Sequence, residues 1–141
     1  MTTDELLKIL RSTRSVNDLT KYNEILSEEN TFSSFSEYFC SYILKNNIVE
    51  SDLIHASQIQ RNYAYQILNG TKKPGRDKVL ALCIAAQMSL DETQRALTLS
   101  NSGKLYPRRK RDSIIIFAID KKISVQQTNE LMYEEDEMPL E

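Results

Sequence analysis

The chain of 141 residues contains little of what marks several specialised classes of protein. It has no tryptophan, three glycines, three prolines, two cysteines and one histidine. Because chain breakers are scarce and long alternating runs of β-branched residues are absent, an all-α protein is expected. Two distant cysteines and one histidine offer no metal-ligand spacing, so we expect neither a metal site nor another cofactor.

The sequence also lacks the features of export and membrane insertion. Its start, MTTDELLKIL, has neither the basic opening nor the continuous apolar run of a signal peptide. No apolar run approaches the roughly 20 residues needed to span a bilayer. We therefore expect a cytoplasmic protein without membrane contact. Cys40 and Cys83 lie in apolar helical patterns, which favours buried free thiols over a disulfide.

The net charge of −2 weighs weakly against nucleic-acid binding, but it hides a local asymmetry. Residues 60–78 carry five basic side chains and one acidic, and so do residues 104–112. Residues 130–141 carry six acidic side chains and no basic one. Because DNA contacts depend on the charge of one face, the basic runs keep DNA binding open. The second run is expected to be a solvated face, with flanking phosphate or the acidic tail as alternative partners. The tail, residues 133–141, is expected to be disordered.

Capping signals and apolar spacing predict a series of helices. Thr3 and Ser15 can cap two amphipathic helices within residues 1–30, and Ser27–Ser33 reads as a linker. Ser34 opens a capping box with Glu37. Helices are predicted from residue 34 to the Asn46–Asn47 pair, over 50–57, 60–68 and 76–88, from 89, over 107–121, and from 124.

The last two capping boxes form an internal repeat. Ser89 and Ser124 each begin a Ser-x-x-Glu or Ser-x-x-Gln motif, and they lie 35 residues apart. Between them, Pro107 suits the first turn of a helix. The run Ile114–Ile119 is apolar on all sides, so it is either a buried strand or a buried helix. A helix is favoured because no partner strand is evident.

The segment Ser51–Pro74 reads as two short helices joined by a tight turn. Five apolar side chains can point inward and lock the pair together: Leu53, Ala56, Ile59, Ala64 and Ile67. The opposite face of the second helix is polar and carries Arg61, Asn62, Tyr65 and Gln66, with Asn69 at its end. Arginine can bond bidentately to guanine, and Asn or Gln to adenine. A glycine stop at Gly70 and a basic loop follow, in which Lys72, Lys73 and then Arg76 can contact phosphates.

These residues, over positions 34–88, resemble the Xre/Cro/C1-type (lambda-repressor-like) helix-turn-helix family. The resemblance implies a five-helix DNA-binding bundle, with extra N-terminal and C-terminal helices in this chain, that acts as a homodimer on a two-fold symmetric operator. It implies base contacts from Gln60, Arg61, Asn62 and Gln66, and backbone contacts from Tyr63, Asn69, Lys72 and Arg76. Tyr65, on the outer face of the helix, and Lys73, in the basic loop, are expected to contact the DNA backbone as well. The chain departs from the family at Glu50, where Gln is common, and at Ser57-Gln58, where the turn usually has Gly. A left-handed Gln58 would cost on the order of 1 kcal/mol.

Several alternatives stay open at this point. The polar face of the second helix could instead be a solvated surface that binds nothing. Tyr63 and Tyr65 could instead be aromatic residues of the core or of an interface. His55 is expected to be a surface residue. A protein-interaction module, such as an antitoxin or adaptor docking through its terminal helices, is the second hypothesis. An enzyme is disfavoured, because no phosphate-binding glycine loop, metal cluster or catalytic triad is recognisable.

The sequence thus predicts three parts and one function. Residues 1–33 form an N-terminal helical extension, residues 34–101 the helix-turn-helix domain, and residues 102–141 a C-terminal helical extension with an acidic tail. The predicted function is a sequence-specific transcriptional regulator of repressor type, which binds an inverted repeat in double-stranded DNA.

Overall fold

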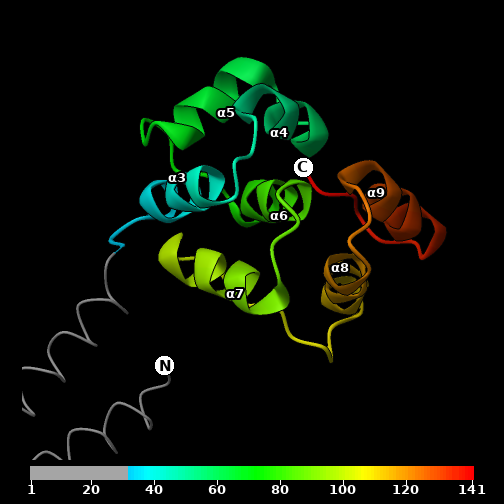
Figure 1. Ribbon diagram of the computed structural model, residues 1–141. Coiled ribbons are helices and arrows are strands. Elements are labelled where there is room, and N and C mark those ends of the chain that lie inside the picture. The colour runs from blue at the N-terminus through cyan, green and yellow to red at the C-terminus, as the bar shows by residue number, and fades with distance from the viewer. Residues whose placement is uncertain (1–31) are drawn as a thin grey trace, which may run out of the picture. The chain divides into compact units, whose positions relative to one another are not determined.

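The structure, a computed structural model, describes residues 32–141, and all regular secondary structure within them is helical. The helices predicted within residues 1–30 lie outside the described residues. Residues 34–141 form one compact unit (Figure 1). Its helices are α3 (Phe35–Lys45), α4 (Glu50–Ser57), α5 (Arg61–Leu68), α6 (Arg76–Ala85), α7 (Leu90–Leu99), α8 (Lys110–Lys121) and α9 (Val125–Glu134). None of these helices is long and apolar enough to cross a bilayer.

The predicted caps account for the starts of three helices. Ser34 Oγ accepts a hydrogen bond from the Glu37 backbone N–H at the start of α3 (3.3 Å). Both later capping boxes are reciprocal: Ser89 pairs with Glu92 at α7, and Ser124 pairs with Gln127 at α9. Each box satisfies two backbone N–H groups that a helix start would otherwise leave without a partner.

Two helix limits differ from the predictions. Helix α6 ends at Ala85 rather than Met88, because Gln87 has φ 58° and the Met88 N–H donates to the Cys83 carbonyl. Helix α8 begins at Lys110, so Pro107 lies in the preceding turn rather than in the helix. The helical alternative for residues 114–119 is confirmed.

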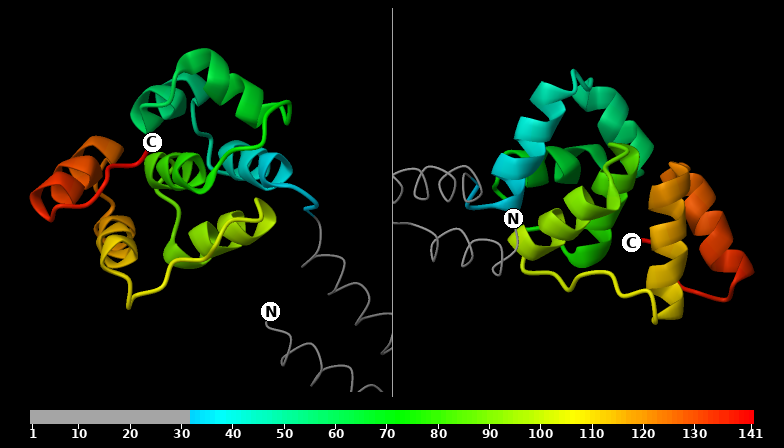
Figure 2. Two further views of the ribbon diagram at one scale, coloured as in Figure 1. Left: turned by 180° about the vertical axis from the view of Figure 1, so that it is seen from behind. Right: turned by 60° about the horizontal axis from the view of Figure 1, so that its bottom comes forward.

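The core lies where α3 and α4 pack on the hairpin of α6 and α7 (Figures 1 and 2). Helix α4 contacts α6, and α3 contacts α7. Phe39 is fully buried there, and Tyr38 and Tyr42 of α3 donate hydrogen bonds to the Glu92 and Ala86 carbonyls. Burial, with the nearby Glu92 carboxylate, raises the pKa of Tyr38 to about 12, so this hydroxyl keeps its donor proton.

Both cysteines are free, as predicted. Cys83 is fully buried in α6, and this burial raises the pKa of its thiol far above the ordinary value. Cys40 is half-buried rather than buried, and its Sγ–H donates to the Leu68 carbonyl (3.3 Å). Both thiols therefore behave as small packing groups.

The internal repeat extends over two complete helical hairpins, α6–α7 and α8–α9. The 35-residue spacing relates the capping serines and the left-handed residues of the two connecting turns, Gln87 and Lys122. It also relates two fully buried threonines, Thr93 and Thr128, whose hydroxyls donate to the carbonyls of those serines. The two turns meet directly, since Lys122 Nζ donates to the Gln87 carbonyl (3.0 Å).

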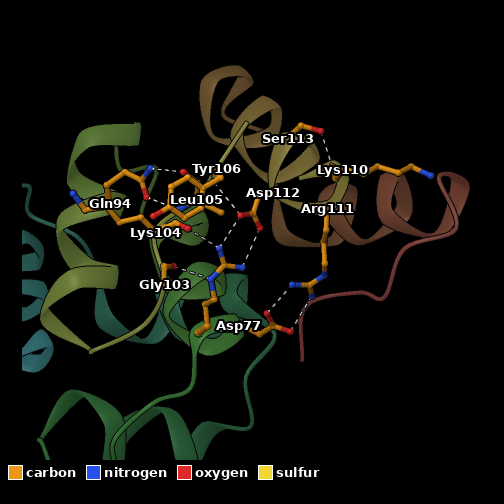
Figure 3. A network of polar contacts seen from close by, with 11 residues as sticks. Asp77, Gln94, Gly103, Lys104, Leu105, Tyr106, Lys110, Arg111, Asp112 and Ser113 are labelled. Carbon is orange, nitrogen blue, oxygen red and sulfur yellow. Dashed lines mark hydrogen bonds and ion pairs between the residues drawn. The ribbon is translucent and has the colours of Figure 1, made fainter. Parts of the chain in front are cut away.

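Reciprocal ion pairs join the two hairpins (Figure 3). Arg76 at the start of α6 donates to both carboxylate oxygens of Asp112 (3.0 and 3.0 Å). Arg111 at the start of α8 donates to both carboxylate oxygens of Asp77 (3.0 and 2.9 Å). These four residues are two Arg-Asp dipeptides 35 residues apart, and each arginine pairs with the aspartate of the other hairpin. The contact is therefore reciprocal, as in a two-fold symmetric interface.

The segments that follow α7 and α9 fold back in equivalent ways. Gln94 exchanges two hydrogen bonds with the backbone of Leu105, and Asn129 accepts one from the backbone of Leu140. Arg111 also donates to the carbonyls of residues 138 and 139. The expectation of a disordered acidic tail is therefore wrong. The tail is held through its backbone, while its carboxylates mostly remain exposed.

Candidate nucleic-acid interface

The turn between α4 and α5 is closed by a serine rather than by a glycine. The Ser57 hydroxyl donates to the Ile54 carbonyl (2.6 Å) and accepts from the Ile59 N–H (3.2 Å). Gln58 follows with φ 60°, so it adopts the left-handed conformation whose cost was considered above. Ser57 is buried and Ala56 is exposed, which corrects the prediction that Ala56 points inward. The feature of the sequence that could have indicated this is the serine hydroxyl, which can bond both a carbonyl and an N–H inside the turn.

The first turn of α5 presents three exposed polar side chains. Gln60 is the N-cap rather than the first helical residue, and its Oε1 accepts from the Tyr63 N–H (2.8 Å). This bond orients the amide and leaves its NH₂ group free to donate outward. Arg61 and Asn62 are exposed beside it. The structure thus brings three of the predicted base readers together at one helix end.

The two tyrosines of α5 have different partners. The Arg61 guanidinium lies over the Tyr65 ring, 5.7 Å from its centroid. Lys78 of α6 lies 5.9 Å from the centroid of Tyr63. Both rings are half-buried and pack against the core, as the alternative reading of these tyrosines held. Tyr65 also supports Arg61 through a cation–π contact, which limits the conformations of that side chain.

The remaining predicted base reader, Gln66, is half-buried in the middle of α5. It lies on the same helix face as Asn62, four residues away. Its side chain is less accessible than those at the first turn. The base-reading candidates therefore differ in exposure along α5, with the most exposed at its N-terminal end.

A tight turn presents the basic loop after α5. Gly70 has φ 83°, and an added Cβ would lie 3.4 Å from Ser36 Oγ, so glycine suits this position. The Lys72 N–H donates to the Gln66 carbonyl, and Asn69 Oδ1 accepts from the Thr71 N–H. The loop backbone is therefore ordered, while Lys72 and its neighbour Lys73 are exposed.

Arg76 does not join this loop. Besides Asp112, its guanidinium donates to the carbonyls of Gly103 and Lys104 (2.8 and 3.1 Å). Its guanidinium N–H donors are therefore committed to partners inside the protein. We therefore assign Arg76 to the joint between the hairpins rather than to phosphate binding. The signal was available in the repeated Arg-Asp dipeptide at the spacing of the capping boxes.

Helix α4 contributes two polar side chains that were not among the predicted DNA contacts. Ser51 and His55 lie one helical turn apart and are both exposed, the latter as expected. Together with Gln60, Arg61 and Tyr65 they line an open hollow of about 640 Å³ between α4 and α5. Their spacing of four residues places them on one face of α4.

The acidic residues at the start of α4 have a local structural role. Val49 is its N-cap and provides no side-chain hydrogen bond. Glu50 and Asp52 lie in the first turn, where a negative charge offsets the partial positive charge of a helix N-terminus. Glu50 therefore stabilises a helix start that lacks a capping side chain.

The second basic run lies away from α5. Arg108 and Arg109 are exposed in the segment between α7 and α8. This segment is at the bottom of Figure 1 and of the left view of Figure 2, whereas α4 and α5 are at the top. Lys110 donates to the Glu135 carbonyl, and Arg111 pairs with Asp77. Part of this run therefore serves the contacts within and between the hairpins.

Within residues 32–141, no group of three or more His, Cys, Asp or Glu side chains is arranged to hold a metal ion. Comparison of the chain with protein-family models, curated proteins and solved structures finds no match.

Proposed function

We propose that the protein is a sequence-specific transcriptional regulator of repressor type that inserts the N-terminal end of α5 into the major groove of duplex DNA. One observation carries the proposal: the exposed N-terminal end of α5, with Gln60, Arg61 and Asn62, is joined by this short helix to the exposed Lys72–Lys73 loop that follows it. In this proposal α3 to α7 form a lambda-repressor-like five-helix bundle, and α8 and α9 are an addition to it.

The side chains at the start of α5 have the chemistry to read purines. Arg61 can donate two parallel hydrogen bonds to the O6 and N7 atoms of guanine. Asn62 and Gln66 can pair bidentately with adenine, and Gln60 keeps an NH₂ donor for a base acceptor. The contact with Tyr65 partly orders Arg61 before binding, which lowers the entropy that binding must remove.

The loop after α5 supplies contacts that do not depend on sequence. Lys72 and Lys73 are exposed, and their ammonium groups have no hydrogen-bond or ion-pair partner within residues 32–141, so they can neutralise phosphates. The Asn69 NH₂ group also remains available, because its Oδ1 holds the turn. Tyr63 and Tyr65 are proposed to contact the DNA backbone at the edges of the helix.

Selection of bound sequences from a random duplex pool at about 150 mM salt tests this function. The wild-type chain is expected to enrich one motif, and Arg61→Ala to lose it. Arg108→Ala is the matched control, since it removes the same charge from an exposed position in the segment between α7 and α8, which lies away from α5 (Figure 1). Enrichment by the control but not by Arg61→Ala would support the assignment. Absence of any enriched motif with the wild-type chain would contradict sequence-specific binding.

A second candidate function is a protein-docking module, such as an antitoxin or adaptor. It is favoured by one surface feature at the α3–α4 corner, where Leu44 is 79% exposed and Val49 is 58% exposed. Glu50 and Asp52 adjoin this apolar pair and would repel phosphate. Duplex binding with a steep salt dependence favours the first function. Its absence, together with a complex that Leu44→Ser disrupts, would favour the second.

A further inference from the structure

The outer face of the α8–α9 hairpin carries apolar side chains around an open hollow. Ile114, Phe117 and Leu131 line this hollow of about 300 Å³, together with Ser113 and Glu135. Phe117 lies in the middle of the face and is 50% exposed. An exposed aromatic beside an apolar hollow is typical of an interaction surface.

The internal repeat shows how this type of face is used elsewhere in the chain. The residues that precede Ile114, Phe117 and Leu131 by 35 positions are Val79, Leu82 and Ala96. These three are fully buried, in the hairpin on which α3 and α4 pack. The same face of a hairpin with the same backbone is therefore covered by helices in the first repeat. In the second repeat it is left half-open by residues 32–141.

Basic and acidic side chains lie at opposite ends of the α8–α9 face, apart from Lys110, whose ammonium group is held by the Glu135 carbonyl. Lys121 lies at the end of α8 where the two helices are joined, 6.0 Å from the Phe117 ring centroid. Glu134 and Glu135 lie at the opposite end of the hairpin, where α9 ends, and both are exposed. A second copy related by a two-fold axis through the middle of the face places its glutamates against Lys121. The same operation repeats the contact at the other end.

We propose that this face, defined by Ile114, Phe117, Leu131, Lys121, Glu134 and Glu135, is a homodimer interface between two antiparallel α8–α9 hairpins. In the dimer the two Phe117 rings fill the paired hollows, and Lys121 of each copy pairs with the glutamates of the other. The proposal goes beyond DNA binding and can fail independently of it, because self-association is measured without DNA.

Sedimentation equilibrium of the full chain tests this interface. The wild-type chain is expected to dimerise, and Phe117→Ser to weaken the dimer roughly 30-fold through loss of its central aromatic. Tyr133→Ser is the matched control, because Tyr133 is an aromatic residue of α9 that is 83% exposed and does not line the hollow. Equal weakening by both substitutions would overturn the proposal.

A charge reversal provides a second test, because it changes only exposed side chains and leaves the core intact. Lys121→Glu is expected to weaken the dimer, because position 121 then repels Glu134 and Glu135 of the other copy. The triple variant K121E, E134K, E135K is expected to restore the dimer, because the opposite charges face one another again with their signs exchanged. Failure of the triple variant to restore the dimer would contradict the antiparallel pairing. A wild-type chain that stays monomeric at every concentration would overturn the interface itself and leave the face to a different protein.

Discussion

Arg76 and Asp112 share two hydrogen bonds of 3.0 Å that connect the first turn of α6 to the first turn of α8. Asp112 is buried, and its second oxygen also accepts from the Tyr106 N–H (3.0 Å). A buried carboxylate depends on such partners, because leaving it unpaired would cost several kcal/mol. This pair and its repeat, Arg111 with Asp77, fix the orientation of the second hairpin on the first.

Removal of Arg76 should destabilise the protein strongly. Arg76→Ala is expected to lower the free energy of unfolding by about 3–5 kcal/mol, because Asp112 then remains buried without its cation. Arg76→Lys should recover only part of this, since lysine cannot form the bidentate pair. Urea unfolding measures the effect. Arg108→Ala, at an exposed position, should change stability by less than about 0.5 kcal/mol. A loss for Arg76→Ala no larger than this control would refute the assigned role.

The two reciprocal ion pairs should differ in strength. The side chain of Asp112 is 3% exposed, whereas that of Asp77 is 25% exposed. Water can therefore solvate Asp77 when its arginine is removed. We expect Arg111→Ala to cost on the order of 1–2 kcal/mol in the same urea experiment, less than Arg76→Ala. The reverse order would show that burial of the carboxylate does not set the energy of these pairs.

The buried carboxylate should also make stability depend on pH. Burial alone would raise the pKa of Asp112, but hydrogen bonds from Arg76 and the Tyr106 N–H outweigh it, so the pKa lies below its ordinary value. Its contribution to stability is therefore present above the unfolded value of about 3.9 and is lost as the pH falls through the lower folded value. Asp112→Asn should flatten this acid limb of the stability–pH curve. Asp136→Asn, at an exposed position, should leave the limb in place.

Replacing Gln58 with glycine should stabilise the protein. Its φ of 60° is costly for a residue with a Cβ, so Gln58→Gly is expected to raise the free energy of unfolding by about 0.5–1 kcal/mol. The same substitution at Gln126, within α9, should lower it by about 1 kcal/mol, because glycine weakens a helix. Thermal unfolding of both variants provides the comparison. Destabilisation at both positions would mean that the Gln58 side chain contributes more than its backbone costs.

Base readers and phosphate contacts should separate in binding experiments on the selected motif. Arg61→Ala is expected to cost about 1–3 kcal/mol and to relax specificity at one base pair. Lys72→Ala should weaken binding to all sequences and reduce the salt slope by about one. Anisotropy titrations at several salt concentrations distinguish these outcomes. Arg61 would lose its proposed role if its removal weakened binding equally for every sequence.

Local signals were sufficient for most of the helical content of residues 32–141. Ser89 and Ser124 predicted two helix starts correctly, because a capping box acts within four residues. Gly70 marked the end of α5 for the same reason. Errors occurred where partners are distant in the sequence. The acidic tail is ordered because Asn129 and Arg111 hold its backbone, which no local pattern indicated.

Sequence alone determined that these residues form helices, where most of them begin, and that α5 has one polar face, since caps and 3.6-residue periodicity are properties of short segments. Only the tertiary structure decided what each basic residue does. Arg76 and Lys72 belong to the same basic run, yet one is bound to Asp112 and the other is exposed. Whether a charge is free depends on what the fold brings beside it, and here that partner lies 36 residues away.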